Sequence, residues 1–249
     1  MIGRGATGAA GRGAAAILLC GLATGCGLLS TDPSLPVYTM EQTDSAHAGH
    51  RKSTITNAGV VYVNDYEEQA LQMSRSDPKE AIGRGPVGGA SVFAIEGQDR
   101  SAYVAVDEGS EMPAYGVYRN ASHPPFDWRN ATFRTMRLDR PDGPTANKET
   151  TDRAILDDVV RTLRDGALAD PPPPPPVVSA TATPQGVYAL LLSSDQLPGI
   201  IFRPSVYVTA PDKVYLSDNL LLTFTRTEQS AKGAWIPVSP AFANWVQTP

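Results

Sequence analysis

Six consecutive prolines, Pro171–Pro176, constrain the fold of this 249-residue chain more than any other feature. Proline lacks a backbone N–H and has a fixed φ, so neither a helix interior nor the middle of a sheet can contain such a run. The run must adopt polyproline II, which at about 3.1 Å per residue spans roughly 19 Å. We therefore expect a stiff spacer, with regular structure confined to the segments on either side.

Short runs of β-branched and aromatic residues predict most of that regular structure. They lie at 59–63, 91–95, 102–106, 115–118 and 133–138 before the prolines, and at 187–192, 206–209, 213–216 and 220–224 after them. Residues 96–101 have the composition of a hairpin loop, so the runs that flank them are expected to pair antiparallel. The final segment, with Trp235, Phe242 and Trp245, is expected to pack back on a core.

Two segments predict helices. A short one is expected around 66–73, where Asn64 or Asp65 offers an N-cap and Pro78 marks the end. The clearer one is expected at 151–164, where the apolar residues fall on one face.

The caps of this second helix can also be predicted from the sequence. Thr150 or Thr151 offers an N-cap, and Gly166 stands where a helix C-terminus favours a residue that can adopt positive φ.

Together these elements predict an α+β fold, mainly antiparallel β with about two helices. The strands after the prolines occupy only about 65 residues, which is marginal for an independent core without disulfides. We expect a small β-rich subdomain at 58–145 and an α+β subdomain at 146–249, in which the second helix covers the sheet and 171–176 form the spacer. Two lobes divided by the prolines, or one domain whose surface they cross, both fit the pattern.

The first 26 residues have the pattern of an export signal. Arg4 and Arg12 precede the uncharged run Gly13–Leu29, whose centre is apolar. The run is at the short end of what could span a bilayer as a helix, so cleavage is expected.

The run contains Leu22-Ala23-Thr24-Gly25-Cys26, which resembles the lipobox of bacterial lipoproteins. The resemblance implies removal of residues 1–25, acylation of Cys26 and anchoring in the cell membrane on its extracytoplasmic face. Ala23 departs from the pattern, because a leucine usually stands three positions before the cysteine. The resemblance covers only the first 26 residues, and an ordinary signal peptide cleaved nearby is the alternative.

Such processing excludes several kinds of chemistry. Both cysteines, Cys20 and Cys26, lie in this segment, so disulfides, thiolate metal sites and cysteine nucleophiles are excluded downstream. Without Arg4 and Arg12 the mature chain has 19 basic and 26 acidic residues, a net charge of −7. Nucleic-acid binding needs a concentrated basic face, so that partner is not expected. Membrane attachment must come from the acyl chains.

Residues 26–57 are expected to form the lipidated cysteine and a flexible tether, since large apolar residues are few. At random-coil dimensions its 28 residues from Ser30 hold the folded part about 30 Å from the lipid. His47 and His50 are candidate metal ligands. A flexible segment gives them no rigid scaffold, so we expect neither a metal site nor a cofactor.

A proline-stiffened loop is the candidate contact site. Phe126, Asp127, Trp128 and Arg129 combine two aromatic rings, a carboxylate and a guanidinium. Such residues stack on sugar rings or anchor a protein partner. Alternatively, Phe126 and Trp128 share one face of a short strand and fill the core.

Three functions remain open at this point. The first is a lipid-anchored, non-catalytic module that binds a protein or cell-wall component at the cell surface. The second is a hydrolase of cell-wall or glycan substrates, which would need paired acids or an activated nucleophile that no motif supplies. The third is a small-ligand receptor of the solute-binding type, although such receptors usually have two larger α/β lobes. We expect the first, and no catalytic residue is predicted.

Overall fold

The computed structural model describes residues 34–44, 51–64, 71–74, 79–85, 91–107, 114–139, 147–170, 173, 186–210, 213–217 and 235–248. Within these ranges it contains fifteen strands in one antiparallel sheet, two α-helices and a short 3-10 helix. The predicted α+β, strand-rich fold is confirmed. Cys26, His47, His50, the predicted strand at 220–224 and all of the proline run except Pro173 lie outside the described residues.

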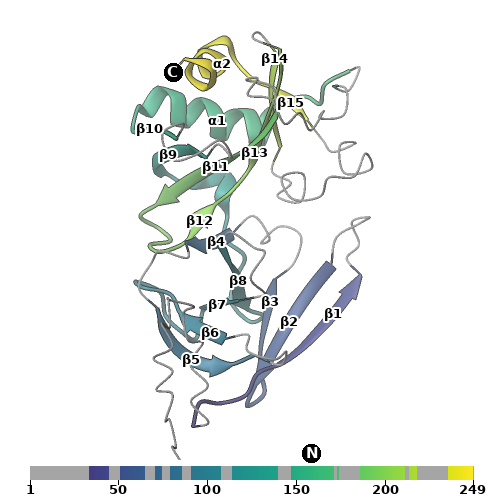
Figure 1. The fold of residues 1–249 in the computed structure, drawn as a ribbon, viewed down its shortest axis with the longest axis vertical. Coiled ribbons are helices and arrows are strands. Elements are labelled where there is room, and N and C mark those ends of the chain that lie inside the picture. Colours follow the sequence, from purple (N-terminus) through teal and green to yellow (C-terminus); the bar gives the residue numbers. More distant parts are fainter. Residues whose placement is uncertain are drawn as a thin grey trace, which may run out of the picture.

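The first eight strands form one end of the molecule (Figure 1). They are β1 (Thr39–Asp44), β2 (Arg51–Asn57), β3 (Val60–Asn64), β4 (Leu71–Ser74), β5 (Glu80–Arg84), β6 (Ser91–Ala94), β7 (Tyr103–Val106) and β8 (Ala114–Asn120). Strands β6 and β7 pair antiparallel, as the loop at 96–101 predicts.

Seven of these strands are hydrogen-bonded in the order β1-β2-β3-β8-β7-β6-β5. The row then returns on itself, because Tyr38 N–H donates to Arg84 O and Arg84 N–H donates to Pro36 O, each at 2.9 Å. The strands curl around one apolar cluster, which consists of Tyr38, Ile55, Tyr62, Val92, Val104, Val106 and Tyr118. Gly83 permits this closure, since a Cβ there would lie 2.2 Å from Tyr38 Cε2.

Strands β1 and β2 lie where the sequence predicts a flexible tether, so that expectation is wrong for 39–44 and 51–57. In β2, Ser53 and Ile55 are buried while Lys52 is exposed, the alternation of a half-buried strand. Only Ile55 is a large apolar residue. Its burial and pairing on both sides with β1 and β3 order a segment whose composition alone reads as polar.

The helix expected around 66–73 is wrong for Leu71–Ser74, which form β4. Leu71 and Met73 are 3% and 1% exposed, and β4 is hydrogen-bonded to β8 on one edge and to β12 on the other. Tertiary pairing on two edges overrides the helical spacing of a few apolar residues. The remaining residues of that predicted helix lie outside the described ranges.

The other end of the molecule contains the remaining strands and both helices (Figure 1). The strands are β9 (Phe133–Asp139), β10 (Lys148–Thr150), β11 (Gly186–Ser194), β12 (Ile201–Phe202), β13 (Ser205–Ala210), β14 (Lys213–Ser217) and β15 (Ile236–Pro237), and the helices are α1 (Arg153–Asp165) and α2 (Pro240–Gln247). Helix α1 packs on β9, β14, β15 and α2, so it covers the C-terminal strands as expected.

The ends of α1 differ in detail from those predicted. Asp152 is the N-cap in place of Thr150 or Thr151, because its Oδ1 accepts the Ala154 N–H at 2.9 Å. Gly166 has a φ of −69°, so positive φ does not explain it. A Cβ at Gly166 would lie 2.3 Å from Ile236 Cγ2, and close packing against β15 therefore accounts for the glycine.

The two ends of the molecule meet through β4 and β12, which pair at Gln72–Ile201 and Leu71–Phe202. One large core cluster crosses this junction and includes Leu71 and Tyr115 on one side and Leu190 and Phe202 on the other. The strands of the two predicted subdomains thus belong to one sheet and share a core.

Two turns interlock beside this junction. The β6–β7 turn at 95–102 contacts the β11–β12 turn at 195–200, and Gln98 Nε2 donates to Pro198 O at 2.7 Å. Gly199 has a φ of +74°, and a Cβ there would lie 2.6 Å from Glu96 O. The two backbones can approach this closely only because the position is glycine.

Candidate functional site

The predicted contact loop is largely built into the core. Trp128 is 4% exposed and its ring stacks on Phe202 with centroids 4.8 Å apart. Phe126 is half-buried and packs against the same cluster. Trp128 begins a 3-10 helix, Trp128–Asn130, and not the short strand that the alternative interpretation assumed. Its ring fills the core and leaves no aromatic anchor at the surface.

The polar side chains of that loop are exposed, and their contacts are with other residues of the same loop. Asp127 Oδ2 accepts from Asn130 Nδ2 at 2.7 Å. The Arg129 guanidinium lies over the Trp128 ring, with Cζ 4.5 Å from the centroid. These contacts stabilise the turn between β8 and β9.

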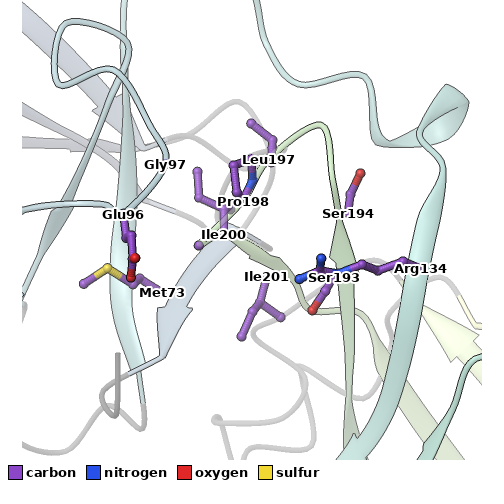
Figure 2. Close-up of a pocket in the computed structure, with 11 residues that line it drawn as sticks. Met73, Glu96, Gly97, Arg134, Ser193, Ser194, Leu197, Pro198, Ile200 and Ile201 are labelled. Atoms are coloured by element: carbon purple, nitrogen blue, oxygen red, sulfur yellow. The ribbon is translucent and has the colours of Figure 1, made fainter. Parts of the chain in front are cut away.

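The structure brings together a different set of residues, in a cleft of about 500 Å³ beside the interlocked turns (Figure 2). The lining comes from β4, the β6–β7 turn, β9, the end of β11, the β11–β12 turn and β12. It consists of Met73, Glu96, Gly97, Arg134, Ser193, Ser194, Leu197, Pro198, Gly199, Ile200 and Ile201. The cleft therefore lies where the two ends of the molecule meet.

Apolar side chains form the middle of this cleft. Met73, Leu197 and Ile200 are each less than a tenth exposed, and Ile201 is half-buried. Met73, Ile200 and Ile201 belong to or adjoin the short strands that join the two ends of the sheet, and Leu197 comes from the middle of the β11–β12 turn.

Opposite charges stand on opposite sides of the cleft. Figure 2 shows Glu96 beside Met73 on one side and Arg134 beside Ser193 on the other, with Ile201 between them. Arg134 Nη1 donates to Asp195 Oδ1 at 2.8 Å, and these two side chains are 62% and 78% exposed.

Ser194 holds the edge of the cleft in place. Its Oγ donates to Thr132 O at 2.9 Å and accepts the Gln196 N–H at 3.1 Å. This hydroxyl therefore links the end of β11 to the segment before β9 and fixes the start of the β11–β12 turn. Its role in the cleft is positioning.

A buried arginine supports the junction behind the cleft. Arg203, directly after β12, is 7% exposed, and its Nη1 donates to Gln72 Oε1 on β4 at 3.4 Å. Burial lowers the pKa of Arg203 to about 10, while the charge of Asp139 acts in the opposite direction. The guanidinium is still protonated at neutral pH, so a polar link joins β4, β9 and the end of β12.

Sequence reasoning missed the cleft. Its residues come from six strands and turns spread between positions 73 and 201, and the turn at 195–200 reads only as a break between strands. Within the described ranges no three His, Cys, Asp or Glu side chains are arranged to hold a metal ion. In the same part of the chain no helix combines the length and apolarity needed to cross a bilayer.

Comparisons of the chain with protein families, with curated proteins and with solved structures gave no match.

Proposed function

We propose that this chain is a lipid-anchored lipoprotein on the extracytoplasmic face of a bacterial cell membrane, and that its folded part is a non-catalytic binding module. The lipobox-like residues before Cys26 support the anchor. The cleft is the observation that supports binding. An apolar centre with a few polar groups around it is the usual composition of a ligand site.

The chemistry of the cleft favours binding over the alternative of cell-wall or glycan hydrolysis. Glycoside hydrolysis uses two carboxyl groups on either side of the scissile bond. Here Glu96 is the one carboxylate among the described residues that line the cleft, and the Ser194 hydroxyl is bonded to backbone groups. A small-ligand receptor is the second candidate, because the cleft lies between the two ends of the molecule.

The anchor is tested by mass spectrometry of the mature protein from native membranes, with Cys26→Ser as the comparison. We expect an N-terminal fragment that begins at Cys26 and carries a diacylglyceryl mass, and release of Cys26→Ser into the medium. An unmodified N-terminus elsewhere, with both forms soluble, would contradict the lipoprotein proposal.

The binding role is tested by native mass spectrometry of the protein purified from its own cell envelope. Ser193→Trp fills the cleft, and Lys52→Trp places the same bulk at an exposed position of β2 as a matched control. We expect a bound mass on the wild type and on Lys52→Trp that is absent from Ser193→Trp. A bound mass that survives in Ser193→Trp, or its absence from all three proteins, would contradict a ligand in the cleft.

A further inference from the structure

We propose that the ligand of the cleft is a short apolar peptide of two or three residues with both termini free, oriented with its ammonium group toward Glu96 and its carboxylate toward Arg134. This inference rests on the proposed binding function and adds the class of ligand. It is carried by the charges, the apolar centre and the size of the cleft.

The charges of the cleft complement a zwitterion. Glu96 is exposed, and no other described side chain forms an ion pair with it. Arg134 presents a guanidinium, whose planar fork of N–H donors matches a carboxylate with two parallel hydrogen bonds. A ligand that spans the cleft meets a negative group at one end and a positive group at the other.

The ion pair between Arg134 and Asp195 leaves room for such a ligand. Both side chains are more than half exposed, and exposed pairs of this kind are weak. A ligand carboxylate can therefore displace Asp195 from the Arg134 guanidinium, or share the guanidinium with it. Removal of the Asp195 charge must therefore strengthen binding of the ligand.

The centre and the volume of the cleft set the length of the peptide. At roughly 30 Å³ for each water, about 500 Å³ holds on the order of sixteen water molecules. That is more than a free amino acid fills and comparable with two or three residues. Ile201 is half-buried in the middle of the cleft and offers an apolar contact to the side chains between the two charged ends.

Isothermal titration calorimetry of the full mature protein with free dipeptides of Ala, Val, Leu and Phe tests the inference. The tightest dipeptide is then compared with its N-acetyl and C-amide forms. We expect each blocked form to bind about two- to fivefold more weakly, because each loses one ion pair with an exposed side chain. Arg134→Gln should weaken the free dipeptide by a similar factor and leave the C-amide unchanged, and Glu96→Gln should behave likewise with the N-acetyl form.

Asp195→Asn should bind the free dipeptide more tightly than the wild type. Arg164→Gln is the matched control for Arg134→Gln, since Arg164 also pairs with an exposed neighbour, Asp165, but lies at the end of α1. It should leave the affinity for the free dipeptide unchanged. Equal affinities for the free and blocked forms, or no binding of any dipeptide at millimolar concentration, would overturn the inference.

The failure of this inference is distinguishable from the failure of the proposed function. A cleft-dependent mass in native mass spectrometry together with no dipeptide binding means that the cleft binds another class of ligand. No cleft-dependent mass and no dipeptide binding means that the binding function itself is wrong.

Discussion

Ala58 adopts a backbone conformation that alanine rarely occupies. It has a φ of +48° and is followed by Gly59 at +82°, in the two-residue turn that joins β2 to β3. Positive φ at both positions is the type I′ hairpin turn, for which Asn-Gly is the preferred sequence. The left-handed region costs a residue such as alanine about 1–2 kcal/mol.

We therefore predict that Ala58→Asn stabilises the protein by about 1 kcal/mol and raises Tm by roughly 2–4 °C. Thermal unfolding followed by circular dichroism measures this change. Ala58→Gly should also raise Tm. A lower Tm for both variants would show that the turn does not have this conformation in solution.

Two tyrosines of the N-terminal cluster make stability sensitive to alkaline pH. Burial raises the pKa of Tyr38 and of Tyr62 above 10.0, with a smaller contribution from Tyr62 to the first and from Asp99 to the second. The folded state therefore favours the protonated phenols. Their contribution to stability is complete below pH 10 and is lost as pH rises through the folded-state pKa values.

Tyr38→Phe should accordingly lose less stability between pH 9 and pH 11.5 than the wild type. Urea unfolding at a series of pH values measures the difference. Identical pH dependence in the two proteins would mean that Tyr38 ionises as freely in the folded state as in the unfolded one.

At the scale of single elements, α2 depends on a lysine from another part of the chain. Lys148 Nζ, on β10, donates to Trp245 O at 2.7 Å and to Thr248 O at 2.9 Å, and lies 5.5 Å from the Trp245 ring centroid. The last carbonyl groups of a helix have no partner within the helix, and a cation there also complements the helix dipole.

Lys148→Met should therefore destabilise the protein by about 1 kcal/mol. Hydrogen exchange at the Phe242 and Val246 amides should accelerate more than exchange in β9 or β11. Lys52→Met, at an exposed position of β2, serves as the control and should alter neither the stability nor the exchange in α2. Unchanged exchange in α2 would show that Lys148 does not stabilise this helix.

The elements that could be predicted are those whose local pattern agrees with their packing. The apolar runs at 91–95 and 102–106 became β6 and β7, and α1 lies within two residues of its expected start. Strand β1 was missed because its six residues are largely polar, and β4 because pairing with distant strands decides its structure. Helix α2 was missed although Ser239-Pro240 is a good start signal: Ser239 Oγ accepts the Phe242 N–H.

At the scale of the whole molecule, the two ends are held together by little regular pairing. Strands β4 and β12 share two residue pairs, and the turns at 95–102 and 195–200 interlock beside them. The cleft lies at this place, so its shape depends on how the ends are oriented. No local sequence pattern contains that information, and the cleft could not be predicted for this reason.

We predict that Gly199→Ala disturbs this junction. The substitution places a Cβ 2.6 Å from Glu96 O at a φ of +74°. Gly59→Ala is a matched control, because Gly59 has a similar φ of +82° but a Cβ there meets nothing within 4 Å. Both variants should lose about 1 kcal/mol from backbone strain, and Gly199→Ala should lose at least as much again from the collision.

Urea unfolding measures these losses, and hydrogen exchange at the Gln72 and Phe202 amides reports on the junction. Exchange there should accelerate only in Gly199→Ala. Equal losses in the two variants would show that the two turns do not touch in solution.

The pairing of β4 with β12 also sets a time at which the chain can finish folding. Gln72 and Ile201 are 129 positions apart, and at synthesis rates of about 5–20 residues per second roughly 6–26 s separate their appearance. Throughout that interval the edge of β4 that pairs with β12 has no partner strand. In the export proposed above, the first half would reach the far side of the membrane before the strand that completes it.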